Sequence, residues 1–575
     1  MCFFPSMSIA LVALFASSVA GLGLRSGLAK KLQLAAELGL DVNAVVKNQD
    51  PVSFRAMIAE STDSSVPAEY VSIPIDHDNP SVGTYRNRYW VNDAYYTPGG
   101  PVILYDVGEV NGEYSAGHLT NRSSMLRSLL QEFNAIGIVW EHRYYGESLP
   151  YPVGNNTPPE HWMYLTTAQA LADIPYFAEN FTRPAYSHFD LTPESTPWVM
   201  VGGSYPGIRA ALMRNEYPDT IFAAYASSAP IQAQIDMSVY YEQIYRAMLA
   251  NGHENCARDI QAALEWIDGQ LAQEDTATVM KQLFFGPGAE KNTNEDFTAA
   301  LAGIFGYVQT HGFGGPRGSL GEFCSYLETD PDTGVSAGYE GLAPSRGNKF
   351  LAEHWAAWPL FTQVVNDNMF TNCQGLNRSS EPICKLNPSP IDPDGIAWTW
   401  QYCSEWGFYQ SNNVGVGSLL SNYQTLEYQQ FQCNRLFPAA LKSGILPSEP
   451  RVTSLNSEHG GWAIRPSNVF WTAGEFDPWR TLSPLSNESF APQGIKATTD
   501  IPQCGVKTPE DTIFGYVGAN MYHCFDFHDS QAATESRKYF NQALKQWLPC
   551  FEKQKQLVNP VSPRQPARPW WFKSP

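Results

Sequence analysis

Several common features are missing from this 575-residue sequence. No segment holds eighteen uninterrupted apolar residues, which argues against a transmembrane anchor. No basic patch opposes the net charge of −20, so a nucleic-acid partner is not expected, and a pI of about 5.0 suits acid surroundings. No HExxH, paired CxxC or glycine-rich phosphate loop occurs, so we expect no metal, nucleotide or redox cofactor.

The N-terminus has the pattern of a secretory signal peptide over residues 1–20. An apolar run from Met7 to Ala16 is too short to span a bilayer, and small residues at Ser18 and Ala20 precede Gly21. No Lys or Arg comes before the run, which is unusual for such a leader. We therefore expect a secreted protein or one in a lysosome-like or vacuole-like acidic compartment.

Cysteine and asparagine patterns agree with export. Removing Cys2 with the leader leaves nine of the ten cysteines, which predicts four disulfides and one remaining thiol. Cys373 with Cys384, and Cys504 with Cys524, are close enough in sequence to suggest local loops. Five Asn-x-Ser/Thr sequons are candidate glycosylation sites: Asn121, Asn155, Asn180, Asn377 and Asn487.

The segment from Trp198 to Tyr217 predicts a strand, a sharp turn and a helix, with Ser204 at the turn. Its apolar run ends in Gly202 and Gly203, where we expect a side chain to collide with the returning helix. Such a nucleophile elbow places a serine hydroxyl where backbone N–H groups can hold an oxyanion. Pro206 replaces the second glycine of the pattern G-x-S-x-G, and proline fits the first turn of a helix.

Strand and helix patterns alternate on both sides of this elbow. Strand-like runs cover 70–75, 85–91, 101–105, 135–140, 467–473 and 512–517, and amphipathic helices are predicted over 164–181 and 530–548. Such alternation is typical of a parallel sheet covered on both faces. From about 235 to 446 the pattern is mainly helical, with Gly- and Pro-rich breaks.

We therefore predict an α/β fold: an α/β-hydrolase sheet in two parts, 66–233 and 451–550, with an inserted, mainly helical cap domain over 234–450. The helix-prone segment 21–65 is an N-terminal arm or a propeptide, and the sequence does not decide between them. The proline-rich segment 551–575 is expected to be a flexible tail.

A serine nucleophile needs an imidazole to take its proton, and the imidazole needs a carboxylate to fix its tautomer. In α/β-hydrolases the order along the chain is serine, acid, histidine, each beyond a strand. Ser204, Asp477 and His523 meet this order and are the predicted catalytic residues. The Tyr205 N–H, and a backbone N–H near Gly108 or Glu109 in the loop after 101–105, are the expected oxyanion donors.

Other residues compete for these roles. Glu475 is a second candidate acid but lies at the strand exit, and His528 is a second candidate base but falls near the closing helix. His459 precedes the acid and is out of order. His142 and Arg143 follow a strand, where a hydrogen-bonded structural corner is the favoured interpretation.

Five motifs, at 88–93, 98–101, 141–147, 202–205 and 474–479, carry a resemblance to a known family. From about residue 70 to 548 the chain resembles the serine peptidase family of lysosomal Pro-Xaa carboxypeptidase, dipeptidyl-peptidase II and the fungal acid prolyl endopeptidases. The resemblance implies the same fold, the same three catalytic residues and cleavage after proline, often at acid pH. Around His523 the sequence reads Tyr-His-Cys-Phe-Asp, which departs from the His-His-Leu-Asp of the animal members.

The resemblance also suggests substrate-binding residues. It implies that Trp479, two residues after the acid, lines a pocket for proline. The aromatic segment 398–410 looks most like the fungal branch and adds Trp400, Trp406 and Glu405 as candidates. Aromatic runs are usually core, but stacked rings would also hold a proline ring.

The sequence thus predicts a secreted serine peptidase that cleaves peptides or proteins on the carboxyl side of proline, as an endopeptidase or a Pro-Xaa carboxypeptidase. A dipeptidyl-peptidase, a carboxylesterase or lipase on the same fold, and a non-catalytic binding module are the alternatives. Since His523 must be neutral to accept a proton, activity should fall when acid protonates it. No membrane partner is expected, and a homodimer is left open.

Overall fold

A computed structural model describes residues 27–47, 51–62, 65–369, 371–376, 381–387, 389–390, 392–413 and 415–551. The predicted signal peptide, the sequon at Asn377 and the tail beyond residue 551 lie outside these ranges. Within them, no helix combines the length and the apolar character that crossing a membrane requires.

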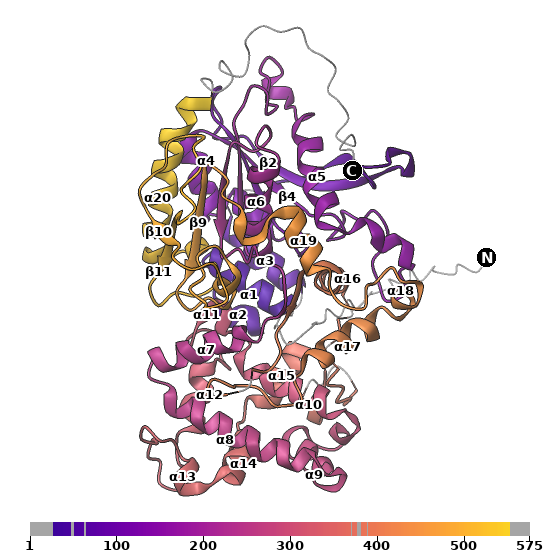
Figure 1. Ribbon diagram of the computed structural model, residues 1–575, viewed down its shortest axis with the longest axis vertical. Helices are drawn as coiled ribbons and strands as arrows, with labels where there is room; N and C mark the ends of the chain where they lie inside the picture. The colour runs from indigo at the N-terminus through magenta and orange to yellow at the C-terminus, as the bar shows by residue number, and fades with distance from the viewer. Residues whose placement is uncertain are drawn as a thin grey trace, which may run out of the picture.

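A nine-stranded sheet forms the centre of the upper part of the molecule in Figure 1, in the order β1-β2-β4-β3-β5-β6-β9-β11-β10. β2 runs antiparallel to both β1 and β4, and the other neighbouring pairs are parallel. This is the predicted α/β-hydrolase sheet. The strands are β1 (Ala68–Pro74), β2 (Thr84–Asn92), β3 (Val102–Asp106), β4 (Ile136–Trp140), β5 (Trp198–Gly203), β6 (Ala223–Ser227), β9 (Val469–Gly474), β10 (Lys496–Thr498) and β11 (Thr512–Gly518).

Alternate residues of the central strands face two separate cores. In β5, Trp198 and Met200 belong to the cluster that includes helices α5 and α6, whereas Val199 and Val201 belong to the cluster that includes α4 and α20. Because both faces are covered, the central strands are buried along their length and read as continuous apolar runs. The four helices are α4 (Met125–Phe133), α5 (Thr167–Ala178), α6 (Tyr205–Glu216) and α20 (Gln531–Trp547).

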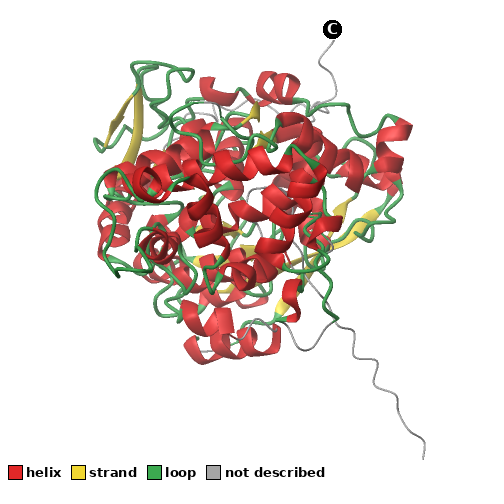
Figure 2. Ribbon diagram, turned by 90° about the horizontal axis from the view of Figure 1, so that it is seen from below, coloured by secondary structure: helices red, strands yellow, loops and turns green. Residues whose placement is uncertain are grey.

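The chain between β6 and β9 forms a mainly helical insertion, as predicted. Most of it lies below the sheet in Figure 1, with its last helix beside the sheet, and helices fill the view from below in Figure 2. Its helices are α7 (Val239–Ala250), α8 (Glu254–Leu271), α9 (Glu274–Phe285), α10 (Asn294–Leu301), α11 (Val308–His311), α12 (Leu320–Leu327), α13 (Ala343–Arg346), α14 (Asn348–Ala356), α15 (Phe361–Met369), α16 (Pro393–Gln401), α17 (Leu426–Leu436), α18 (Pro438–Ser443) and α19 (Val452–His459). Two short parallel strands, β7 (Gln234–Asp236) and β8 (Gly407–Tyr409), were not predicted, because three residues are too few to show an alternating pattern.

Four disulfides are present, and Cys524 belongs to none of them. The predicted local pair Cys373–Cys384 is confirmed. The suggested pair Cys504–Cys524 is wrong: Cys504 bonds to Cys550 at the end of the closing helix, while Cys524 lies buried in the loop of His523. The four disulfides are Cys256–Cys324, Cys373–Cys384, Cys403–Cys433 and Cys504–Cys550.

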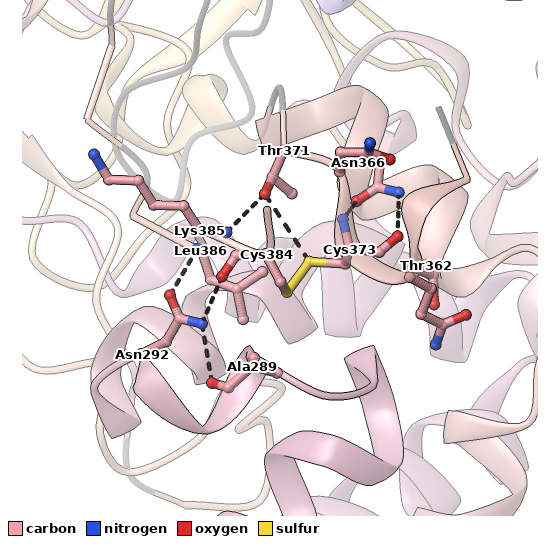
Figure 3. The surroundings of a disulfide bond; sticks show 12 residues. Ala289, Asn292, Thr362, Asn366, Thr371, Cys373, Cys384, Lys385 and Leu386 are labelled. Atoms are coloured by element: carbon pink, nitrogen blue, oxygen red, sulfur yellow. Dashed lines mark hydrogen bonds between the residues drawn. A yellow bond between two sulfur atoms is a disulfide. The ribbon is translucent and has the colours of Figure 1, made fainter. Parts of the chain in front are cut away.

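The Cys373–Cys384 disulfide lies in a loop held by asparagine side chains (Figure 3). Asn366 accepts the Cys373 N–H at 2.8 Å and donates to its carbonyl oxygen at 3.1 Å. Asn292 donates to the Cys384 carbonyl oxygen at 3.0 Å and accepts the Leu386 N–H at 2.8 Å. Side-chain hydrogen bonds therefore fix both sides of the bridge.

The helix-prone N-terminal segment forms three helices, α1 (Gly27–Glu37), α2 (Val42–Lys47) and α3 (Pro51–Ser61). This arm packs against both parts of the protein and lies between them in Figure 1. Its buried apolar side chains, which include those of Leu38 and Phe54, form a cluster with Tyr307 of the insertion. The arm therefore contributes a small core of its own to the folded chain.

A buried carboxylate ties the arm to the loop after β3. Glu37 Oε2 lies 3.2 Å from His118 Nε2 and accepts a hydrogen bond from the Tyr105 hydroxyl at 3.3 Å. Burial alone would raise the pKa of Glu37, but its hydrogen bond and charge interaction with His118 outweigh this and lower the pKa below its ordinary value. Ionised Glu37 is therefore favoured in the folded protein.

The arm also covers one predicted glycosylation site. Asn121 is buried, and its amide donates to the Leu38 carbonyl oxygen at 3.2 Å and to Ser61 Oγ at 2.8 Å. The acceptor nitrogen of this sequon is thus engaged, which contradicts the prediction of a glycan there in the folded chain. Three other predicted sites are exposed: Asn155, Asn180 and Asn487.

Replacing Leu38 by Ala should reduce the free energy of unfolding by about 2–5 kcal/mol, because it leaves a cavity in the cluster between the arm and Tyr307. Chemical denaturation of the purified protein measures this. Leu283→Ala is the matched control, since Leu283 is 42% exposed on α9 and should change stability little. Equal stability of the two variants would show that the arm adds nothing to the fold.

Candidate active site

Ser204 lies at the turn between β5 and α6 with φ 68° and ψ −131°, a conformation that non-glycine residues rarely adopt. The turn is held by the Ser204 N–H, which donates to the Ser227 carbonyl oxygen at 2.9 Å. A Cβ on Gly202 would lie 2.2 Å from the Pro206 carbonyl oxygen, so the predicted collision with the returning helix is confirmed there. The predicted nucleophile elbow is therefore formed.

Gly203 is required for a different reason from the one expected. A Cβ at this position would lie 2.9 Å from Cys524 Sγ and 3.1 Å from the Phe527 ring, not against the helix. Cys524 follows His523 directly, so the loop that carries His523 packs on the turn that carries Ser204.

His523 and Asp477 form a fully buried pair. His523 Nδ1 lies 2.9 Å from Asp477 Oδ1, which also accepts the Trp479 N–H at 2.9 Å. A carboxylate at Nδ1 favours the tautomer with the proton on that nitrogen, which leaves Nε2 as a proton acceptor. Among the described residues nothing hydrogen-bonds to Nε2.

The competing residues are engaged elsewhere. Glu475 accepts the Asn520 N–H at 2.8 Å, and His459 Nδ1 lies 2.8 Å from Glu216 Oε1. His528 lies partly buried in the segment before α20, and desolvation lowers its pKa. Of the acids and bases considered, only Asp477 and His523 are hydrogen-bonded to each other.

His142 and Arg143 form the structural corner that the sequence favoured. Arg143 donates to Asp173 at 2.8 and 2.5 Å, and His142 Nδ1 lies 2.6 Å from the Arg143 carbonyl oxygen. His142 Nε2 lies 3.1 Å from the Tyr205 hydroxyl, and burial together with Arg209 keeps the pKa of His142 well below its usual value. A neutral His142 thus accepts from Tyr205 and fixes the residue beside Ser204.

Of the two expected oxyanion donors, the Tyr205 N–H is suitably placed and the Gly108 N–H is not. Tyr205 is the first residue of α6, where a backbone N–H has no helical acceptor. The Gly108 N–H instead donates to Asp106 Oδ1 at 3.1 Å, so the prediction for Gly108 is wrong. Gly108 still has a structural role. Its φ is 69°, and a Cβ there would lie 2.3 Å from Pro206 Cγ, so only glycine lets this loop pack against the elbow. Glu109, the alternative named from the sequence, comes next in this loop.

Two predicted substrate-binding residues, Trp400 and Glu405, contact residues outside the elbow. Trp400 stacks on Trp162 at a centroid distance of 5.3 Å, and Glu405 accepts the backbone N–H and the hydroxyl of Thr167, at 2.9 and 2.8 Å, near the start of α5. Trp398, two residues before Trp400, contacts the Tyr205 ring at 5.3 Å. Residues two apart on a helix lie on nearly opposite faces, so only one of these tryptophans can meet Tyr205.

A row of aromatic rings links the elbow to the histidine. The centroid distances are 6.1 Å from Tyr205 to Trp406, 5.6 Å from Trp406 to Phe408, 5.2 Å from Phe408 to Trp479 and 6.5 Å from Trp479 to His523. Trp406 and Trp479 thus lie beside the candidate site, and their role in binding substrate stays a prediction. Phe408 was not predicted, and its φ of 59° follows a π-helical turn (Tyr402–Trp406), a combination that often marks functional sites.

One group of three metal-ligand side chains lies within the described residues: His253, Cys324 and Glu328. Cys324 Sγ is bonded to Cys256, so it offers no thiolate to a metal. The donor chemistry therefore does not fit a metal centre here.

A carboxylate of the insertion binds the loop that carries Glu109. Asp394 Oδ2 accepts the Asn111 N–H at 2.7 Å, and its Oδ1 accepts the Gly146 N–H at 3.1 Å. Burial and the nearby charge of Asp392 raise the pKa of Asp394 to about 7. Asp394 thus connects α16 to two loops at the edge of the candidate site.

Residues 74–495 match the family described as serine carboxypeptidase S28. The chain belongs to this family. The resemblance noted from the sequence is thereby confirmed at the level of the family. The matched region runs from the last residue of β1 to just before β10 and includes Ser204 and Asp477.

Two relatives show the extent of the similarity. A probable extracellular serine carboxypeptidase of Arthroderma benhamiae is 29% identical over 74% of this chain, and the match spans 61% of that protein's length. A thymus-specific serine protease of Mus musculus is 27% identical over 84% of this chain and 87% of its own. Among solved structures, an esterase of Pyrobaculum calidifontis is 16% identical over 37% of this chain and 61% of its own, with a TM-score of 0.21. The fold assignment therefore depends on the order and direction of the strands.

Asp394 gives a prediction about pH and stability. Its pKa is raised from 3.8 to about 7 on folding, so its protonation favours the folded state. The stability that it contributes is fully present below about pH 4 and is lost as the pH rises through 7. In Asp394→Asn the side chain cannot ionise, so the fall in thermal midpoint between pH 4.5 and 8 should shrink by roughly a few degrees.

Calorimetry across this pH range measures the effect. Asp332→Asn is a suitable control, because the Asp332 side chain is 69% exposed. An unchanged pH dependence in Asp394→Asn would contradict the prediction.

Proposed function

We propose that this protein is a secreted serine peptidase that hydrolyses peptide bonds on the carboxyl side of proline at acid pH. The observation that carries the proposal is the buried 2.9 Å pair of His523 and Asp477, with the loop of His523 packed directly against the elbow of Ser204. Membership of the serine carboxypeptidase S28 family supports the same chemistry. Ser204 is the nucleophile, His523 the general base and Asp477 the residue that orients it.

In the first half of the reaction, Ser204 Oγ attacks the carbonyl carbon of proline while its proton moves to His523 Nε2. Asp477 stabilises the resulting imidazolium through Nδ1, and the N–H groups of Tyr205 and Glu109 hold the oxyanion. The C–N bond then breaks, and the proton on Nε2 passes to the departing amine. An ester between Ser204 and the acyl part of the substrate is left.

In the second half, water attacks this ester and gives its proton to His523 Nε2. A second tetrahedral intermediate forms at the same oxyanion donors. The C–Oγ bond breaks, the proton returns to Ser204, and the free carboxylate of proline leaves. No cofactor enters this sequence of steps.

The row of aromatic rings supports specificity for proline. Tyr205, Trp406, Phe408 and Trp479 join the elbow to the acid loop through ring contacts and are all buried. A pyrrolidine ring is compact and apolar, so rigid aromatic faces bind it with little loss of conformational freedom. Trp400 and Glu405 take no part in this proposal, since they contact other residues.

Partly buried carboxyl groups support operation at acid pH. Burial raises the pKa of both Asp394 and Glu328 to about 7, and it also raises the pKa of Glu405. Carboxyls of this kind favour the folded state when they are protonated, so they stabilise the protein on the acid side of neutrality. The net charge of −20 at pH 7 also falls in magnitude as carboxylates take up protons.

The family description and the Arthroderma relative favour a carboxypeptidase, with an endopeptidase as the second candidate and a dipeptidyl-peptidase as the third. An unblocked peptide with proline inside and near both ends distinguishes them through the masses of the released fragments. Loss of a single C-terminal residue indicates a Pro-Xaa carboxypeptidase. Hydrolysis of a short acyl ester without any peptide cleavage would favour an esterase instead.

Ser204→Ala should reduce turnover of a chromogenic peptide substrate by about 10⁴-fold or more, because it removes the nucleophile. The variant should also fail to react with a fluorophosphonate probe that labels the unaltered protein. Ser195→Ala, in a loop before β5, is the control. Undiminished turnover by Ser204→Ala would remove the proposal.

Phe408→Ala should raise KM for proline substrates about tenfold or more with a smaller change in kcat, because one ring of the aromatic row is lost. Steady-state kinetics with a proline and an alanine substrate measure the effect, which should be larger for proline. Phe431→Ala, at a half-exposed position of α17, is the matched control. Equal effects on the two substrates would show that Phe408 does not recognise proline.

A further inference from the structure

We infer that Gln309, on the short helix α11 of the insertion, is a positioning residue that holds the loops of His523 and Asp477 in register. This inference deepens the proposed function and depends on it for its catalytic meaning. Gln309 lies in neither loop, and no sequence motif points to it.

The backbone and the side chain of Gln309 bind two different loops. Its carbonyl oxygen accepts the His523 N–H at 2.9 Å, and its side-chain Oε1 accepts the Trp479 indole N–H at 2.9 Å. Oε1 also accepts the Tyr240 hydroxyl at 3.0 Å. Gln309 thus connects His523, Trp479 and α7.

The orientation of the Gln309 amide follows from its partners. An indole N–H can only donate, so the atom that faces it must be the carbonyl oxygen of the amide. The Trp479 N–H in turn donates to Asp477 Oδ1 at 2.9 Å. Gln309 therefore fixes the ring of Trp479 while the backbone of the same tryptophan fixes the carboxylate that holds His523.

The His523 loop is held from two sides. On the sheet side, Asp526 accepts hydroxyl groups from Tyr225, Ser227 and Thr472, each at 2.6 Å. The Cys524 N–H, next to His523, also donates to Ser228 Oγ at 2.8 Å. The contact with α11 supplies the opposite side and comes from the insertion.

The arm supports this contact. Tyr307, two residues before Gln309, is buried in the apolar cluster of the N-terminal arm. The His311 N–H donates to the Tyr307 carbonyl oxygen at 2.9 Å and closes α11. The arm thus packs against the helix that carries Gln309, so the position of His523 depends on how the insertion packs on the rest of the protein.

The test uses the full-length protein and three variants. Gln309→Leu keeps the approximate size but removes the acceptor for Trp479. Gln309→Glu keeps an acceptor oxygen, and Thr310→Ala changes α11 next to Gln309 at a position that is only partly buried. Two measurements are made on each: hydrogen exchange of the segments 475–482 and 519–527, and the rate at which a fluorophosphonate labels Ser204.

We expect Gln309→Leu to speed exchange in both segments severalfold and to slow labelling and kcat about tenfold to hundredfold, since small misplacements of catalytic groups have effects of this size. The acid limb of its pH–rate profile should also move, because the surroundings of His523 change. Gln309→Glu should restore protection in both segments, and Thr310→Ala should resemble the unaltered protein.

Two failures are distinguishable. If Gln309→Leu exchanges and labels like the unaltered protein, the positioning role is rejected while the proposed function stands. If the unaltered protein neither labels nor hydrolyses peptides, the proposed function is rejected, and the exchange measurement still decides whether Gln309 holds the two loops.

Discussion

The arrangement of this protein depends on keeping one imidazole and one carboxylate together in a dry interior. Both side chains of the His523–Asp477 pair are fully buried, and burying such groups is unfavourable unless each is hydrogen-bonded. Asp477 accepts from Trp479 as well as from His523, and the loops on either side are tied to the sheet and to the insertion. The pair is stable only because two parts of the chain close around it.

Two motifs that first indicated the family, 88–93 and 141–147, meet in a buried polar network around Glu141. Glu141 is buried and accepts from Arg88, from the Gly112 N–H at 2.8 Å and from the Ser148 hydroxyl at 2.7 Å. Gly112 lies in the loop after β3, which also carries Glu109. The charged residues of these motifs thus shape a loop at the edge of the site and need not touch a substrate.

Much of the fold could be predicted from local patterns. The central strands have continuous apolar runs because helices cover both faces, and the elbow shows itself in a few adjacent residues. The order of serine, acid and histidine then follows from the topology. Strand β6 gave a weak signal, since Ala223 to Ser227 holds no β-branched residue that would mark a strand.

Features that depend on distant contacts could not be predicted. Cys504 pairs with Cys550 because of where α20 ends, and Glu405 binds Thr167, far away in the sequence. The choice of Trp398 over Trp400 depends on the rotational phase of α16, and the loss of the Gly108 N–H depends on the side chain of Asp106. Each of these requires knowledge of a partner that no local pattern reveals.

The positions of the disulfides have a mechanical consequence. Three of them, Cys256–Cys324, Cys373–Cys384 and Cys403–Cys433, lie within the insertion, and Cys504–Cys550 lies within the sheet domain. Among the described residues, no disulfide joins the insertion to the sheet domain, and the two parts are linked covalently only by the polypeptide chain on either side of the insertion. The insertion is therefore held on the sheet domain by noncovalent contacts, such as those of Gln309 with Trp479 and His523. Reduction of the disulfides would destabilise each part without removing a covalent link between them.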